Sequence, residues 1–218
     1  MSKKILALGD CNTEGDVHFR NNAFPERFAK QIDFECINCG YTMSTTKEMI
    51  NFYNDNISEE IDVILIQYGL VDSWRTFKYS PYVLYYPDSF FRKLGRKIIK
   101  KYKKIARSLG LNTLFGSKFS VSPEEYKRNI EKIVNDSKDK LVFLIDTIPN
   151  KDLKRNIYIK QYNSILDEIS TNNKNCHKVN LYDEFEKNLD NFYLDETHIN
   201  DKGYDLIAKR LNEKYQEC

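Results

Sequence analysis

The sequence lacks several features that would define other classes of protein. No apolar run approaches the ~20 residues of a membrane-spanning helix, and the N-terminus predicts no signal peptide, because its apolar run is short and no small-residue cleavage site follows. Its five cysteines are an odd number, which favours a reducing compartment over a disulfide framework. No internal repeat or low-complexity linker is present. We therefore expect a cytoplasmic globular protein.

The size and composition predict one folded domain, residues 1–218. The chain has 218 residues, of which 41% are hydrophobic and 13% aromatic. A chain of this length can bury a sizeable core without disulfides or metals, and this composition is not that of a disordered protein.

Short apolar runs alternate with helical patterns along the chain. The runs cover residues 4–8, 33–37, 61–68, 141–146 and 177–181. They are continuous rather than alternating, which is typical of strands buried on both faces of a parallel sheet. Helices are predicted at 21–31, 45–57, 151–171, from Ser122 onward and in the C-terminal stretch. This alternation predicts an α/β fold with about five strands.

An insertion of about residues 73–121 separates the third strand from the Ser122 helix. Within it, segment 92–109 holds nine basic residues and no acidic one, with apolar residues at helical spacing. One interpretation is a helix whose apolar face packs on its own domain and whose charged face is solvated. The other is attraction to an anionic membrane surface or an anionic substrate. No nucleic-acid partner is expected. The preceding aromatic stretch, residues 80–91, either lines a pocket or packs the insertion down.

Three polar clusters follow predicted strands or precede the last helix, where ligands bind in open α/β sheets. They are Gly9-Asp10-Cys11, Gly69-Leu70-Val71-Asp72 and Asp195-Glu196-Thr197-His198. Cys11 stands at a strand-to-helix turn, where a helix N-terminus lowers a thiol pKa and favours the nucleophilic thiolate. His198 could serve as its base, and Asp195 could orient the imidazole.

Simpler interpretations compete with this one. Cys11 could be a small buried residue at a turn, and His198 could cap a helix. Cys36 and Cys39 have the spacing of half a zinc site, but no second pair exists, so buried thiols are the preferred interpretation.

Four stretches resemble the sequence blocks of the SGNH, or GDSL-type, hydrolases. They are ILALGDCNTEG, INCGYTMSTT, DVILIQYGLVD and DETHINDKGYDLIAKRL, in the family's order and covering nearly the whole chain except the insertion. The resemblance implies a flavodoxin-like, three-layer α/β/α fold. It also implies hydrolysis of an ester or thioester, or acyl transfer, without a metal or cofactor.

The resemblance assigns roles, with three departures. Cys11 takes the position of the nucleophilic serine, His198 that of the base and Asp195 that of its orienting acid. The asparagine donor of the family's oxyanion hole falls on Val71, which donates nothing, and the second-block glycine falls on Met43, with Gly40 nearby. The residues expected around the oxyanion and substrate are Asp10, Asn12, Gly40, Met43, Val71, Asp72 and Arg75.

The segment GLVDSWR is similar to the third block of SGNH-like proteins from bacterial surface-polysaccharide gene clusters. We therefore expect an acyl-ester hydrolase or acyltransferase that acts on a carbohydrate or glycan precursor with a Cys-His-Asp triad. The alternative is a catalytically silent binding or scaffold protein of the same fold, held at the inner membrane surface by the basic helix.

Overall fold

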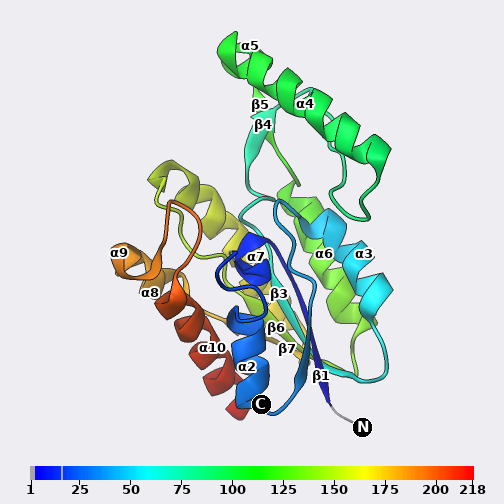
Figure 1. Ribbon diagram of the computed structural model, residues 1–218, viewed down its shortest axis with the longest axis vertical. Coiled ribbons are helices and arrows are strands. Elements are labelled where there is room, and N and C mark those ends of the chain that lie inside the picture. The colour runs from blue at the N-terminus through cyan, green and yellow to red at the C-terminus, as the bar shows by residue number, and fades with distance from the viewer. Residues whose placement is uncertain (1–2, 16) are drawn as a thin grey trace.

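A five-stranded parallel sheet forms the centre of the protein (Figure 1). The computed structural model describes residues 3–15 and 17–218. The strand order is β2-β1-β3-β6-β7. The strands are β1 (Lys4–Gly9), β2 (Glu35–Asn38), β3 (Ile61–Gln67), β6 (Leu141–Ile145) and β7 (Cys176–Val179). The central strands are almost wholly buried, as their continuous apolar sequences predict.

Helices cover both faces of the sheet and produce the three layers that the sequence predicts. One face packs against α3 (Thr46–Asn56), α6 (Pro123–Asp136) and α7 (Asn156–Asn172), which the 3-10 turn η1 (Leu153–Arg155) precedes. The other face packs against α2 (Phe24–Gln31), α8 (Tyr182–Glu186) and α10 (Asp201–Gln216), with the short α9 (Leu189–Phe192) beside them. The Ser122 hydroxyl caps α6 as expected, and Pro123 occupies its first turn.

The insertion forms a separate small module at one end of the molecule (Figure 1). It consists of β4 (Arg75–Phe77), α4 (Phe90–Ser108), α5 (Leu111–Phe115) and β5 (Ser117–Phe119). The two strands pair antiparallel and carry α4 away from the body of the protein. We call residues 73–121 the insertion module.

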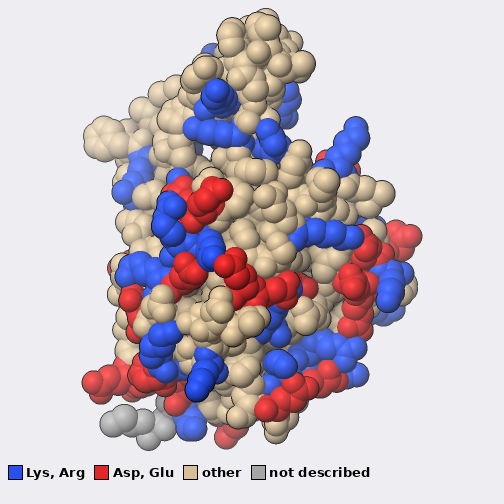
Figure 2. All heavy atoms as spheres, turned by 180° about the vertical axis from the view of Figure 1, so that it is seen from behind, with Lys and Arg blue, Asp and Glu red and all other residues tan. Residues whose placement is uncertain are grey.

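The basic helix does not pack its apolar face on the domain, so that interpretation is wrong. Ala106 is the one buried residue of α4. Ile98 is 61% exposed, and the exposed large apolar residues of α4 and its C-terminal flank are Phe90, Phe91, Leu94, Ile98, Tyr102, Ile105 and Leu109. Figure 2 shows a mostly tan outer end of the module, with Lys and Arg side chains beneath it. The helix instead turns most of its cations toward the rest of the protein.

The loop after β2 lies unusually close to the end of the first helix, α1 (Cys11–Glu14). A Cβ atom at Gly40 would lie 2.1 Å from the backbone nitrogen of Glu14. Only glycine permits this approach, which brings the loop to the carboxyl edge of β1. Within the described ranges, no helix is both long and apolar enough to cross a bilayer.

We predict that Gly40→Ala separates this loop from α1 and lowers the free energy of unfolding by about 1–3 kcal/mol, the usual cost of an overpacked site. Urea denaturation measures the change. The control is Gly95→Ala in α4, where the added Cβ lies 3.8 Å from Val83 and alanine favours the helix. Equal stability of the two variants would contradict the prediction.

Candidate active site

Cys11 is the first residue of α1, directly after the carboxyl end of β1. Asp10 caps this short helix by accepting a hydrogen bond from the Asn12 N–H at 3.1 Å. The Cys11 side chain is 8% exposed and packs in a small cluster with Leu70, Ile159 and Tyr182. The thiol is therefore largely enclosed by side chains from three other segments.

His198 and Asp195 meet across one turn of the loop before α10, as the sequence predicts. The Asp195 Oδ2 atom lies 2.7 Å from Nδ1 of His198, and its Oδ1 atom accepts the N–H groups of Thr197 and His198. Burial raises the pKa of Asp195, but the hydrogen bonds from His198 and Thr197 outweigh it and leave the pKa below its usual value. An ionised carboxylate at Nδ1 fixes the ring and leaves Nε2 for chemistry.

Asn12 joins the loop of His198 to the turn that contains Cys11. Its side-chain amide donates to the carbonyl oxygen of Thr197 at 3.2 Å, and its Oδ1 atom accepts the N–H of Ile199 at 3.3 Å. These are the residues on either side of His198. Asn150, after β6, adds a hydrogen bond to the Thr197 hydroxyl at 3.0 Å. The structure thus places the loop of Asp195 and His198 against the turn of Cys11, at one edge of the sheet.

The expectation of a lowered Cys11 pKa is wrong for the resting site. Burial raises the pKa of the thiol, and the charge of Asp10 raises it further. The helix that should lower it has only four residues, and Asp10 occupies its N-cap. Burial also raises the pKa of Asp10 to about 6. The raised pKa favours the neutral thiol of Cys11.

The loop of the second block lies against α1 through a carboxylate. Glu14 Oε2 accepts the Thr42 N–H at 2.7 Å and the Thr42 hydroxyl at 2.5 Å, and the Ser44 N–H bonds to Tyr41. Met43, between them, has φ 68°, the left-handed conformation that favours glycine. Its N–H has no hydrogen-bond partner in the described chain. Met43 therefore has a backbone N–H without a described partner, at the position onto which the resemblance maps the family's glycine.

The third block divides between site and core. Val71 lies at the site and brings no polar group, as expected. Asp72 is wholly buried, and its Oδ1 atom accepts the N–H and hydroxyl of Thr46 at the start of α3. Its Oδ2 atom has no partner among the described residues. Asp72 therefore anchors the start of α3. These bonds indicate a structural role and not the substrate contact that the sequence predicts for Asp72.

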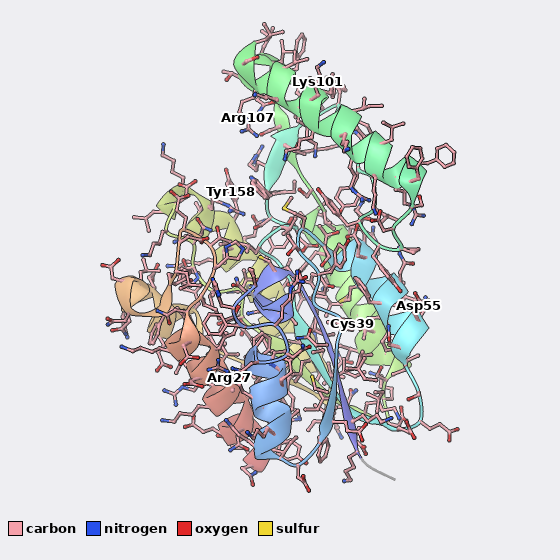
Figure 3. The ribbon with its side chains drawn as sticks, in the orientation of Figure 1. Arg27, Cys39, Asp55, Lys101, Arg107 and Tyr158 are labelled. Atoms are coloured by element: carbon pink, nitrogen blue, oxygen red, sulfur yellow. The ribbon has the colours of Figure 1, made fainter. Side chains whose placement is uncertain are left out.

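A pocket of about 750 Å³ lies between α4 and the body of the protein. Met43 and Val71 of the second and third blocks are among its lining residues, whereas Cys11, Asp195 and His198 are not. Its other lining residues include Trp74, Arg75, Tyr82, Tyr85, Lys93, Arg96, Lys97, Lys100, Lys103, Lys104 and Arg107. In Figure 3, Arg107 lies on the side of α4 that faces the body, whereas Lys101 lies on the outer part of the helix.

Arg75 and the aromatic stretch shape this pocket. Arg75 donates to the hydroxyl and carbonyl oxygens of Ser117 and stacks on Phe119 and Tyr158, so it braces β4 against β5 at the rim. Tyr82 and Tyr85 line the pocket. Tyr86 stacks on Phe52 of α3 at 3.8 Å and packs the module down. The aromatic stretch 80–91 therefore both lines the pocket and packs the insertion module against the body of the protein.

Three contributors to the site were missed at the level of sequence. They are Glu14, Asn150 and Arg155, whose guanidinium donates to the carbonyl of Leu70 at 2.9 Å. Asn150 follows the fourth strand, at the same sheet edge as the other clusters, and this position was a usable signal. Cys36 and Cys39 are free thiols, and no group of three or more His, Cys, Asp or Glu residues converges to hold a metal within residues 3–15 and 17–218.

The family model of the GDSL-like lipase/acylhydrolase family matches residues 7–206. The chain belongs to this family, and by class it is a hydrolase that acts on ester bonds. The resemblance found in the four blocks is thereby confirmed. No curated protein is significantly similar to the chain in sequence.

Solved structures share the fold at low sequence identity. A lipase/acylhydrolase from Enterococcus faecalis superposes with a TM-score of 0.68 and 16% identity, covering 99% of this chain and 96% of its own. A catalytic mutant of an acetylxylan esterase from Geobacillus stearothermophilus gives 0.64 and 15%, covering 98% and 95%. A lipolytic G-D-S-L family protein from Veillonella parvula gives 0.63 and 14%, covering all of both chains. These matches confirm the predicted fold.

We predict that the unfolding free energy of the Asp72→Asn variant, measured relative to that of the parent, increases as pH rises from 5 to 8. Burial raises the pKa of Asp72 to about 7, above its value in the unfolded chain. Its stabilising contribution is therefore present at low pH and lost as pH rises through 7. The asparagine stays neutral, so the difference in unfolding free energy should grow by about 2 kcal/mol or more.

Urea denaturation at four pH values measures this difference. The control is Asp139→Asn, because Asp139 is exposed and Lys140 keeps its pKa below the usual value. A pH-independent difference for Asp72→Asn would show that Asp72 is ionised throughout this range.

Proposed function

We propose that the protein removes an acyl group from an ester of a carbohydrate through Cys11, His198 and Asp195. The observation that carries the proposal is the pair of hydrogen bonds from Asn12, the neighbour of Cys11, to both flanks of His198. With Nδ1 held by Asp195, Nε2 remains available to the thiol. A silent binding protein would need neither the held imidazole nor its carboxylate.

In the proposed reaction, the sulfur of Cys11 attacks the acyl carbonyl carbon as its proton passes to Nε2 of His198. The carbonyl electron pair moves to oxygen, where the N–H groups of Cys11 and Met43 can donate to it. The ester carbon–oxygen bond then breaks, and the alcohol leaves with the proton from His198. Water hydrolyses the acyl thioester, or a hydroxyl acceptor takes the acyl group. Because the resting thiol is neutral, attack and deprotonation occur together.

The basic and aromatic residues that line the pocket favour a carbohydrate substrate that carries negative charge. Five of the α4 cations that line the pocket form no salt bridge with a described acidic side chain: Lys97, Lys100, Lys103, Lys104 and Arg107. Such a concentration of one charge sign attracts an anionic ligand. Tyr82, Tyr85 and Trp74 supply flat surfaces of the kind that pack against sugar rings. By its name, the Geobacillus relative acts on an acetylated xylan.

We predict that 4-nitrophenyl acetate acetylates Cys11 in the parent. A brief incubation, acid quench and peptide mass spectrometry should detect one acetyl group on the Cys11 peptide. His198→Ala should lower the rate of acetylation by about 10²-fold or more, because a general base contributes that much. Cys11→Ala should abolish the modification.

In this acetylation experiment, every protein carries Cys218→Ser, so that direct reaction of this exposed thiol does not obscure the result. Cys176→Ala is the matched control, because this thiol is also buried but lies on β7. If Cys11 is never acetylated in a folded parent, the enzymatic proposal fails, and a carbohydrate-binding protein becomes the better interpretation.

A second candidate function is attachment to an anionic membrane surface through α4. The observation that favours it is the row of exposed apolar residues on α4 and its C-terminal flank, which includes Leu94, Ile98 and Leu109 and which we call the apolar ridge. Lys101 lies on the outer part of the same helix (Figure 3). Apolar side chains can enter the acyl boundary of a bilayer while lysines contact lipid phosphates. In this arrangement the pocket cations remain free for the substrate.

We predict that the parent sediments with phosphatidylglycerol-containing vesicles and much less with phosphatidylcholine vesicles. Ile98→Ser with Leu109→Ser should abolish binding, and Lys101→Glu should weaken it about fivefold, the equivalent of about 1 kcal/mol per cation near the surface. Val17→Ser, at an exposed apolar residue outside the module, is the control. Equal binding by the parent and the ridge variant would eliminate this candidate.

A further inference from the structure

The active site lacks a side-chain donor at the position where its family carries an asparagine. Val71 occupies that position, and the two backbone N–H groups of Cys11 and Met43 leave the oxyanion with one donor fewer. Loss of one such donor usually costs ~10²–10³ in rate. An enzyme that works with this site needs a replacement.

Arg155 lies beside the third-block turn that contains Val71. Its Nη2 atom donates to the carbonyl oxygen of Leu70, the residue before Val71, at 2.9 Å. Its guanidinium stacks on the ring of Trp74 at 4.7 Å. The third-block turn thus holds the guanidinium from two sides.

The same helical turn brings Arg155 to the thiol. Arg155 ends η1, and Ile159, one turn further along in α7, packs against Cys11 and Leu70. Residues four apart lie on one face of a helix. In agreement with this placement, the guanidinium interacts electrostatically with both Asp10 and Cys11.

The guanidinium retains unused hydrogen-bonding capacity. An arginine carries five N–H donors, and its side-chain hydrogen bond within the described residues goes to Leu70. Its backbone N–H bonds to Asp152, at the opposite end of the 3-10 turn. The remaining N–H donors belong to a partly buried cation that interacts electrostatically with Cys11, and hydrogen bonds from such a cation to an anion are strong.

We propose that Arg155 is the anion-holding residue of this site and replaces the family's asparagine as an oxyanion donor. As the Cys11 sulfur adds to the acyl carbonyl and the electron pair moves to oxygen, the guanidinium donates to that oxygen. The proposal rests on the proposed acyl-transfer function, but its first test does not require turnover.

The first test compares alkylation of Cys11 by iodoacetate, an anion, and by iodoacetamide, its neutral analogue. Peptide mass spectrometry follows Cys11, and Cys218 serves as an internal reference in the same molecule. In the parent, the iodoacetate-to-iodoacetamide rate ratio at Cys11 should exceed that at Cys218. Arg155→Gln should lower the Cys11 ratio at least about fivefold, the equivalent of a single charge a few Å away in a partly solvated site.

Arg128→Gln is the matched control, because Arg128 is also an arginine but is exposed on α6, outside the candidate site. Its Cys11 ratio should equal that of the parent. An unchanged ratio in Arg155→Gln overturns the proposal. So does a Cys11 that excludes both reagents, because an acyl oxygen could not then reach the guanidinium either.

The second test uses acetylation of Cys11 by 4-nitrophenyl acetate. Arg155→Gln should slow it ~10²–10³-fold, and adding Val71→Asn to that variant should recover part of the loss by restoring the family's donor. Recovery separates a lost donor from a distorted fold, which a new asparagine would not repair. If the parent shows the charge-dependent ratio without acetylation, Arg155 still holds an anion at Cys11 and the acyl-transfer function is what fails.

Discussion

The hydrogen bonds of Asn12 connect the two ends of the chain, and the site depends on them. Its amide group accepts from Ile199 and donates to Thr197, so an α1 residue determines where the loop of His198 lies. Asp195 can orient the imidazole only within its own loop. Because Asn12 directly follows Cys11, its two bonds to the neighbours of His198 link the turn of the thiol to the loop of the histidine.

The bonds of Glu14, the last residue of α1, position the turn of Met43, the proposed oxyanion donor, in the same way. Glu14 holds Thr42 while Gly40 passes close to the helix backbone, and Met43 adopts a left-handed conformation between its bonded neighbours. One four-residue helix therefore carries Cys11, the link to the loop of His198 and the support of the turn that contains Met43. This concentration explains why the turn is buried although it contains several polar side chains.

Much of this arrangement follows from the sequence, and the failures have physical causes. The continuous apolar runs predict the sheet, and only the edge strand β2 starts two residues late, because its side chains are partly exposed and its pattern is weak. Amphipathic spacing predicts α4 but cannot tell which face meets the protein. Arg155 has no local pattern at all, since its contact with Leu70 arises from the packing of α7 across 85 residues of chain.

The orientation of α4 and the position of Arg155 point to one electrostatic design. The module carries cations over the outer part of the pocket, and Arg155 adds one beside the thiol. Burial and Asp10 raise the pKa of Cys11, so the site stabilises the neutral thiol before substrate arrives. A positive charge then has its greatest effect when negative charge develops on the substrate, where it lowers the barrier more than it stabilises the resting enzyme. In the proposed mechanism, the absence of asparagine at Val71 is thus compatible with catalysis, because Arg155 at the start of α7 supplies a donor in its place.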